Sequence, residues 1–222
     1  MPLGAKIDFP EGSVAYFWKL TESVATLVER CREFGVSLRA DEMRCHENRL
    51  REKLAEVLLM RHIFGEEVTL GHTDAGAPMV DIEGCHISIS HTRGWVCIAR
   101  NDSHRMGIDV ESSGRDRVLR VRERFLDSEE LQSVPDGDVE ANLLAWTAKE
   151  ALYKLFVGKG GESLNEHYGV EGAVKVLAGG MAMRGATAVC LPGERLVVFS
   201  KVLPDAVVSL AVEAKFCSAL EL

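Results

Sequence analysis

Asp109 and Glu111 stand two residues apart in the apolar segment Gly-Ile-Asp-Val-Glu at 107–111. Successive side chains of a β-strand point to opposite faces, so we expect both carboxylates on one face and Ile108 and Val110 on the other. Adjacent carboxylates repel each other unless a cation lies between them. Mg²⁺ commonly binds one or two protein carboxylates and completes its coordination with water and phosphate oxygens. The pair therefore indicates either a Mg²⁺ site or the polar outer face of an edge strand.

A further carboxylate, Glu150, lies in the segment Trp-Thr-Ala-Lys-Glu-Ala-Leu-Tyr-Lys at 146–154. On a helix, Glu150 and Lys154 would be one turn apart, beside an apolar stripe that can pack on a sheet. An exposed Glu–Lys pair of this kind contributes only about 0.3–0.5 kcal/mol to stability. The functional alternative is that Glu150 completes the metal site while Lys154 neutralises a phosphate.

The segment Ile-Ser-Ile-Ser-His at 87–91 alternates strictly between apolar and polar residues. This pattern predicts a strand with its isoleucines facing the core, its serines facing the other way, and His91 at its end. No G-x-S-x-G motif surrounds Ser90, which argues against a hydrolase nucleophile. A hydroxyl and an imidazole at a strand end can contact phosphate, and a histidine bonded to the backbone is the structural alternative.

These segments together resemble the 4'-phosphopantetheinyl transferase superfamily, of the long, monomeric, surfactin-synthetase-activating type. The resemblance rests on residues 76–78, 87–92, 107–111, 125–130 and 146–154, which occur in the family order. It implies a Mg²⁺ site, which Mn²⁺ can also fill, formed with the pyrophosphate of coenzyme A by Asp109, Glu111 and Glu150. It further implies that the coenzyme A phosphates contact Ser90, His91 and Lys154.

The resemblance implies that a serine of an apo acyl- or peptidyl-carrier protein attacks the β-phosphorus of coenzyme A, releasing 3',5'-ADP. Besides Lys154, which would neutralise the phosphate, the implied catalytic residues include a base for the serine proton. Glu130 is the preferred base, Glu129 is its alternative after a one-residue slip in the match, and Glu150 is the other candidate. A relative that binds coenzyme A or a carrier without catalysis is the alternative function. The sequence does not identify the carrier or the pathway.

One position departs from the family pattern. Relatives commonly have a phosphate-binding lysine where this chain has Ala77. The cation that replaces it is left open among Arg39, Arg44 and Arg61.

The chain has 222 residues and a formal net charge of -8, so we expect no general binding to nucleic acid. A local exception is the arginine-rich segment 115–124. On a helix, Arg117, Arg120 and Arg124 would form one stripe, which can dock an acidic carrier protein or simply face solvent.

Six cysteines without C-x-x-C or zinc-ligand spacing predict reduced thiols. Together with the absence of a recognisable secretory signal and of a long apolar run, they predict a cytoplasmic protein that does not enter a membrane.

The elements that must position these residues follow from periodicity and turn signals. Strands are predicted at 14–20, 68–70, 78–82, 86–90, 96–99, 106–111, 196–202 and 207–214. Helices are predicted at 21–34, at 42–64, and from 116 to 156 with a break at 135–137; glycines at 158–161 would end the last one. The predicted fold is α+β, of the α/β sandwich type. The repeated order of helices followed by strands suggests two similar halves, 1–112 and 113–222, each with helices on a small, mostly antiparallel sheet. The resemblance implies that the active site lies in the cleft between them.

Overall fold

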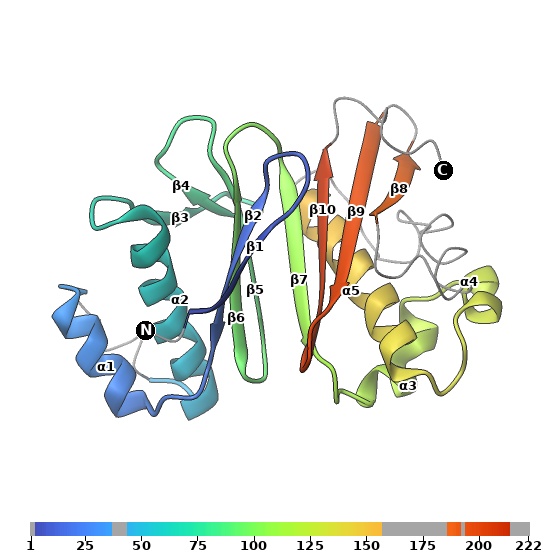
Figure 1. Ribbon diagram of the computed structural model, residues 1–222, viewed down its shortest axis with the longest axis horizontal. Coiled ribbons are helices and arrows are strands. Elements are labelled where there is room, and N and C mark those ends of the chain that lie inside the picture. The colour runs from blue at the N-terminus through green and yellow to red at the C-terminus, as the bar shows by residue number, and fades with distance from the viewer. Residues whose placement is uncertain (1–2, 37–43, 157–185, 192–193, 214–222) are drawn as a thin grey trace.

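Two four-stranded antiparallel sheets stand side by side in the middle of the molecule, with helices on their outer sides (Figure 1). The computed structural model describes residues 3–36, 44–156, 186–191 and 194–213. The strand order is β1-β2-β6-β5 in the first sheet and β7-β10-β9-β8 in the second, and β3 and β4 form a small separate ribbon. The predicted α+β class with antiparallel sheets is confirmed. The similarity of two halves and their boundary at residue 112 stay predictions.

The first sheet consists of β1 (Leu3–Asp8), β2 (Val14–Lys19), β5 (His86–Thr92) and β6 (Trp95–Asn101). The second consists of β7 (Met106–Ser112), β8 (Ala186–Leu191), β9 (Glu194–Val202) and β10 (Ala206–Glu213). The ribbon is β3 (Leu70–His72) with β4 (Pro78–Val80). The helices are α1 (Val24–Glu33), α2 (Glu47–Phe64), α3 (Arg117–Val121), α4 (Ser128–Ser133) and α5 (Val139–Phe156), and η1 (Arg122–Arg124) is a 3₁₀ turn. No helix in the described part of the chain has the length and apolar composition needed to cross a membrane.

The element boundaries correct the sequence predictions at three places. Edge strand β1 was not predicted, because its six residues show no sustained alternation. Helix α2 begins at Glu47 instead of near residue 42, since His46 caps it by accepting the Asn48 N–H through Nδ1 at 3.4 Å. The helix predicted from 116 is divided into α3, η1 and α4. The helix stop predicted at 158–161 lies outside the described residues.

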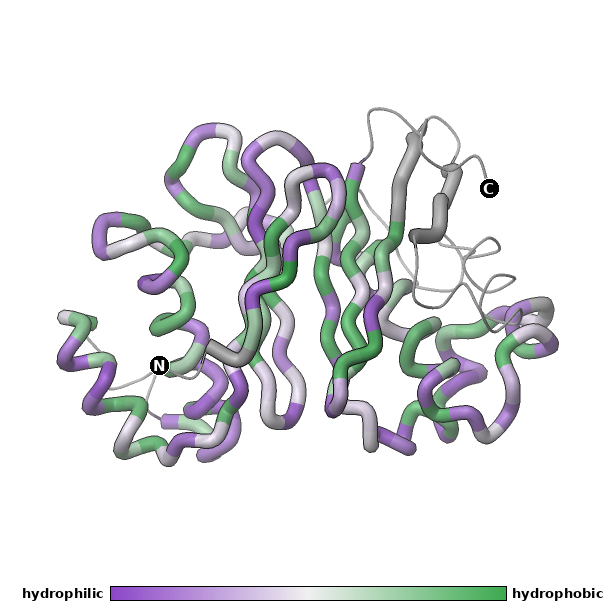
Figure 2. The backbone as a smooth tube through the Cα atoms, in the orientation of Figure 1, coloured by the Kyte–Doolittle hydropathy of each residue, from purple (hydrophilic) through white to green (hydrophobic). Residues whose placement is uncertain are grey.

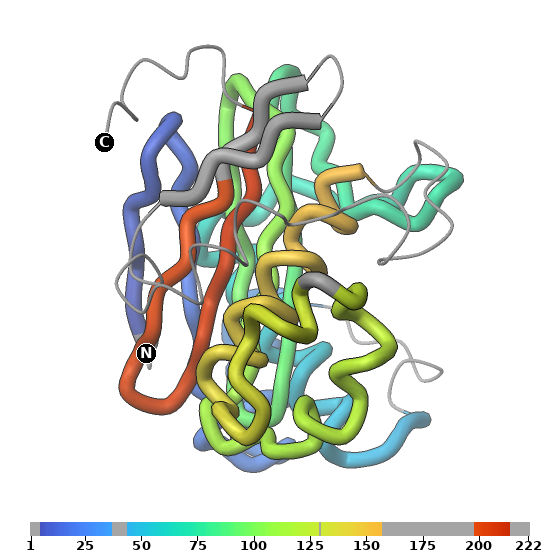
Figure 3. Tube along the Cα trace, turned by 90° about the vertical axis from the view of Figure 1, so that its right-hand side faces the viewer, coloured from blue at the N-terminus to red at the C-terminus, as the bar shows by residue number. Residues whose placement is uncertain are grey.

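Apolar side chains fill the space between the two sheets and the space under each helix layer. Phe17 and Trp95 of the first sheet meet Ile108 and Leu210 of the second in the central cluster. Helices α1 and α2 cover the outer face of the first sheet, and α5 covers the outer face of the second (Figures 1 and 3). Hydrophobic segments run along the central strands, and the helices at the two ends carry hydrophobic and hydrophilic segments in mixture (Figure 2).

Gly107 sets how closely α5 packs on β7. A Cβ atom built at Gly107 would lie 2.1 Å from the Ala151 carbonyl oxygen and 2.6 Å from the Leu155 nitrogen. Only glycine leaves room for such an approach. The close contact brings the last turns of α5, which carry Glu150 and Lys154, against the acidic strand.

Candidate active site

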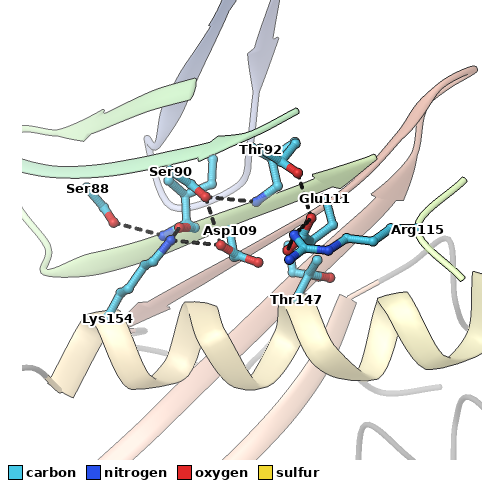
Figure 4. Close-up of polar contacts among 11 residues, drawn as sticks. Ser88, Ser90, Thr92, Asp109, Glu111, Arg115, Thr147 and Lys154 are labelled. Atoms are coloured by element: carbon cyan, nitrogen blue, oxygen red, sulfur yellow. Dashed lines mark hydrogen bonds and ion pairs between the residues drawn. The ribbon is translucent and has the colours of Figure 1, made fainter. Parts of the chain in front are cut away.

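The acidic strand β7 meets β5 through hydroxyl groups of the first sheet (Figure 4). Ser88 Oγ accepts the Ile108 N–H at 3.0 Å, and Ser90 Oγ accepts the Val110 N–H at 3.2 Å. The alternation of β5 places these serines on one face, as predicted from the sequence. The seam between the sheets is therefore polar, and the carboxylates of β7 open onto it.

Asp109 is at the centre of this seam. Its Oδ1 accepts hydrogen bonds from Ser90 Oγ at 2.7 Å and from Lys154 Nζ at 2.8 Å. Lys154 also donates to the Ile108 carbonyl at 3.0 Å, which fixes its ammonium group beside the strand. Burial raises the pKa of Asp109, although Lys154 and Ser90 oppose this shift. The buried Oδ2 has no hydrogen-bond partner among the described residues, so this carboxylate retains a free acceptor.

Glu111 lies on the same side of β7 as Asp109, but both of its oxygens are engaged. Thr92 Oγ1 donates to Oε2 at 2.6 Å. Arg115 Nη1 lies 2.5 Å from Oε1 and 2.6 Å from Oε2 (Figure 4). The carboxylate is thus neutralised by a cation from its own chain.

Glu150 faces this acidic strand from α5. Burial, followed by the negative charge of Asp109, raises the pKa of the Glu150 carboxyl from 4.5 to about 7, and the Lys154 charge opposes the shift. A carboxyl with a pKa near neutrality can exchange a proton at physiological pH.

The donor set suits a hard divalent cation. Three carboxylates approach the same seam from two elements, and one of their buried oxygens, Asp109 Oδ2, lacks a partner among the described residues. Within the described residues, no three acidic, histidine or cysteine side chains are already gathered into a metal-binding group. Glu111 is held by its ion pair with Arg115.

Glu130 is not brought to the acidic cluster. It is 2% exposed, and its Oε2 accepts hydrogen bonds from Lys149 Nζ at 2.5 Å and from the Asp127 N–H at 2.8 Å. Lys149 is fully buried and also donates to the Phe125 carbonyl at 2.5 Å. These contacts suit a structural role in holding the 125–130 loop on α5. The side chain of Glu129 lies outside the described part of the chain.

His91 points away from Ser90, toward the α2 side of β5. Its Nε2 lies 2.6 Å from Arg49 Nη1, and its Nδ1 lies 3.9 Å from Glu52. Adjacent residues of a strand face opposite sides, so the structure separates the two predicted phosphate contacts. His91 and Arg49 form a second polar site on the other face of β5.

Ala77 lines a cavity of about 540 Å³ that continues to Lys154. Of the cations proposed to replace the family lysine, Arg61 instead donates to the Glu66 carbonyl and lines a different cavity. Arg44 is exposed just before α2. Arg39 lies outside the described residues. The lining of the Ala77 cavity includes three basic side chains, which are Lys154, His86 and Arg105.

The arginine stripe is only partly realised, because α3 ends at Val121 and the chain continues as a 3₁₀ turn. Arg117 and Arg124 line a cavity of about 370 Å³, but Arg120 does not. The cavity also contains Arg115, Glu111 and Trp146, so it adjoins the acidic strand.

Sequence reasoning missed several side chains that shape the site. Thr92 extends the period-two row of hydroxyls begun by Ser88 and Ser90, and this periodicity could have identified it. Arg115 was grouped with the neighbouring arginines, although its guanidinium serves Glu111. Lys149 lies within the segment 146–154 that carries the resemblance, but its partner Glu130 is 19 residues away and could not be read from that segment. Arg49 is 42 residues from His91, and no local pattern connects the two.

Comparison with known families agrees with this geometry. Residues 105–171 match the model of the 4'-phosphopantetheinyl transferase superfamily. The matched segment includes β7 and α5, and therefore Asp109, Glu111, Glu150 and Lys154, while β5 precedes it. A comparison with curated proteins found no match. The resemblance seen in the sequence is confirmed: residues 105–171 carry a domain of the 4'-phosphopantetheinyl transferase superfamily.

Proposed function

We propose that the protein transfers 4'-phosphopantetheine from coenzyme A to a serine of an apo acyl- or peptidyl-carrier protein in a Mg²⁺-dependent reaction. The observation that carries this proposal is the convergence of Asp109, Glu111, Glu150 and Lys154 at one seam inside the matched segment. The superfamily transfers phosphopantetheine in general. The carrier, the metal and the residue roles below belong to the proposal.

Lys154 and Ser90 are proposed to bind the pyrophosphate of coenzyme A. Both now donate to Asp109 Oδ1, so an incoming phosphate oxygen needs only a small reorientation of these donors. Their positive and polar groups would hold the β-phosphorus in place, and positioning with charge neutralisation is the main requirement of phosphoryl transfer. His91 and Arg49, on the other face of β5, are assigned to the 3'-phosphate of the same ligand.

Asp109, Glu111 and Glu150 would hold Mg²⁺. The bound ion would neutralise charge on the pyrophosphate during transfer. The acceptor serine oxygen forms a bond to the β-phosphorus, the bond to 3',5'-ADP breaks, and the serine proton passes to a base. We assign this base to Glu150, whose second oxygen would accept the proton if its role as a ligand leaves that oxygen free. Glu130, the base preferred from the sequence, is already bonded to Lys149 and to the Asp127 N–H.

Arg117 and Arg124, which line the cavity beside Glu111, are proposed to meet the acidic surface of the carrier. Complementary charge of this kind acts on encounter and orientation and is screened by salt. Arg120 is retained in the proposed docking surface but lies outside the cavity lining.

The decisive experiment incubates the protein with coenzyme A, Mg²⁺ and an apo-carrier and records the intact mass of the carrier. The expected result is the mass increase of one phosphopantetheine group, lost in Lys154→Ala and kept in a control, Lys6→Ala, at an exposed lysine of β1. A chain that binds coenzyme A without modifying any apo-carrier would be the non-catalytic relative instead.

A further inference from the structure

Arg115 occupies the carboxylate that the proposed metal site needs. Its Nη1 contacts both oxygens of Glu111, at 2.5 and 2.6 Å, and Glu111 is only 7% exposed (Figure 4). Thr92 takes up the remaining acceptor capacity of Oε2 from the other side. While Arg115 stays in place, its guanidinium therefore competes with any further cation for both oxygens of Glu111.

The two carboxylates of β7 are consequently in different states. Asp109 Oδ2 is buried and lacks a hydrogen-bond partner among the described residues, whereas both oxygens of Glu111 accept hydrogen bonds. Of the two groups that bind Glu111, Thr92 is buried on β5 and cannot leave without disturbing the sheet. Arg115 belongs to the turn after β7, where its N–H bonds to the Ser112 carbonyl, and its side chain is 47% exposed. Arg115 is the group that can move.

We propose that Arg115 is an internal counterion that neutralises Glu111 in the metal-free protein and is displaced when the divalent cation binds. This inference rests on the proposed function, because it takes Glu111 as a metal ligand. A divalent cation and the guanidinium repel each other and would share the same two oxygens, so metal binding competes with a charge-assisted ion pair. The metal alone therefore binds weakly, and the phosphates of coenzyme A supply the additional ligands that overcome the competition.

The displaced guanidinium has a defined place to go. Arg115 already lines the 370 Å³ cavity together with Arg117 and Arg124, and the apolar residues Val118 and Trp146 belong to the same lining. Once released from Glu111, Arg115 would present its positive charge to this cavity beside the other two arginines. Metal loading would then strengthen the binding of an acidic partner there, which couples the two events and favours loading of coenzyme A before docking.

Mn²⁺ binding without coenzyme A, measured by electron paramagnetic resonance and calorimetry, tests the competition directly. Arg115→Ala should bind Mn²⁺ at least about fivefold more tightly than the wild type, since it removes a charge-assisted pair that is partly screened by solvent. Arg115→Gln, which keeps a hydrogen-bond donor without the charge, should also bind more tightly and decides the test if the alanine variant does not fold. The matched control Arg117→Ala removes a cation from the same cavity without touching Glu111 and should stay within about twofold, because its charge acts only at a distance.

The outcomes separate this inference from the proposed function. Wild-type binding that is lost in Asp109→Ala but equal in the Arg115 variants overturns the inference and leaves the metal site intact. No Mn²⁺ binding by any of these proteins, with or without coenzyme A, overturns both. The coupling is checked with a carrier whose acceptor serine is replaced by alanine: addition of Mn²⁺ and coenzyme A should raise its affinity more for the wild type than for Arg115→Ala. An equal gain in both proteins contradicts the coupling.

Discussion

The buried ion pair between Glu130 and Lys149 makes a sharp prediction, because a structural role and a catalytic role for Glu130 lead to opposite results. Lys149 is 0% exposed and Glu130 is 2% exposed. In Glu130→Gln the Lys149 ammonium remains buried without its countercharge, and breaking a buried pair in this way costs about 3–5 kcal/mol. That loss is a large part of the roughly 5–15 kcal/mol that holds a typical domain folded.

The loss should be visible as a fall in unfolding temperature. For a chain of this size, about 2–4 °C is lost per kcal/mol, so Glu130→Gln should unfold roughly 6–20 °C earlier by calorimetry. The double variant Glu130→Met with Lys149→Met replaces the pair by apolar side chains of similar length. It should recover most of the stability, with about 1–3 kcal/mol still missing because the Asp127 N–H and the Phe125 carbonyl lose their partners.

The same variants test the base assignment. At a temperature where all of them are folded, the double variant should still modify an apo-carrier, as read by intact mass, because Glu130 Oε2 is held by Lys149 and the Asp127 N–H and has a structural role. Our reasoning is refuted if Glu130→Gln unfolds at the wild-type temperature, or if the folded double variant has lost transfer. The first result would remove the structural role of the ion pair, and the second would return Glu130 to the role of base.

Four further predictions concern the seam itself. Asp109→Ala should abolish transfer by intact mass while lowering the unfolding temperature less than Glu130→Gln does; substantial turnover would contradict the metal assignment. Gly107→Ala should cost at least about 1–3 kcal/mol in denaturant unfolding, because its Cβ would lie 2.1 Å from an α5 carbonyl oxygen, and a wild-type midpoint would show that α5 can shift. Because the pKa of Glu150 rises from 4.5 to about 7 on folding, its contribution to the free energy of unfolding is complete below pH 4.5 and is lost as the pH rises through 7. In the metal-free protein, Glu150→Gln should therefore reduce the fall in the free energy of unfolding between these pH values. An unchanged fall would assign it to other groups. Ala77→Lys should tighten coenzyme A binding by about 0.5–1 kcal/mol in calorimetry, with Ile82→Lys as the control for an added charge, and equal affinities would mean that another cation already serves the phosphate.

Local periodicity predicted the parts of the site that lie within one element. The alternation of β7 places Asp109 and Glu111 on one side, and the helical turn places Glu150 beside Lys154. These relations depend only on the repeat of a strand or a helix, so the sequence determines them. The same rule separates His91 from Ser90 as strand neighbours, and its application to that pair would have predicted their opposite orientations.

The predicted strands and helices were confirmed in most of the described chain, but the helix from 116 was wrong in its continuity. The 116–133 region contains arginines and apolar residues at helical spacing, yet η1 interrupts it where Arg122 donates to the Val134 carbonyl at 2.6 Å. The helix propensity of a short segment does not include such a tertiary contact, because the acceptor carbonyl lies twelve residues further along the chain.

The sequence by itself determined that carboxylates, a lysine and hydroxyls occur on elements able to present them, since each pattern is complete within a few residues. Only the tertiary structure decided which polar side chains are partners. Lys149 forms an ion pair with Glu130 across 19 residues of sequence, and Arg115 forms one with Glu111 across a turn that is not helical. Arg49 forms a hydrogen bond with the His91 ring across 42 residues. Pairing depends on which side chains the folded chain brings within hydrogen-bond distance and removes from water, and that choice is made by the packing of α5 and α2 on the two sheets.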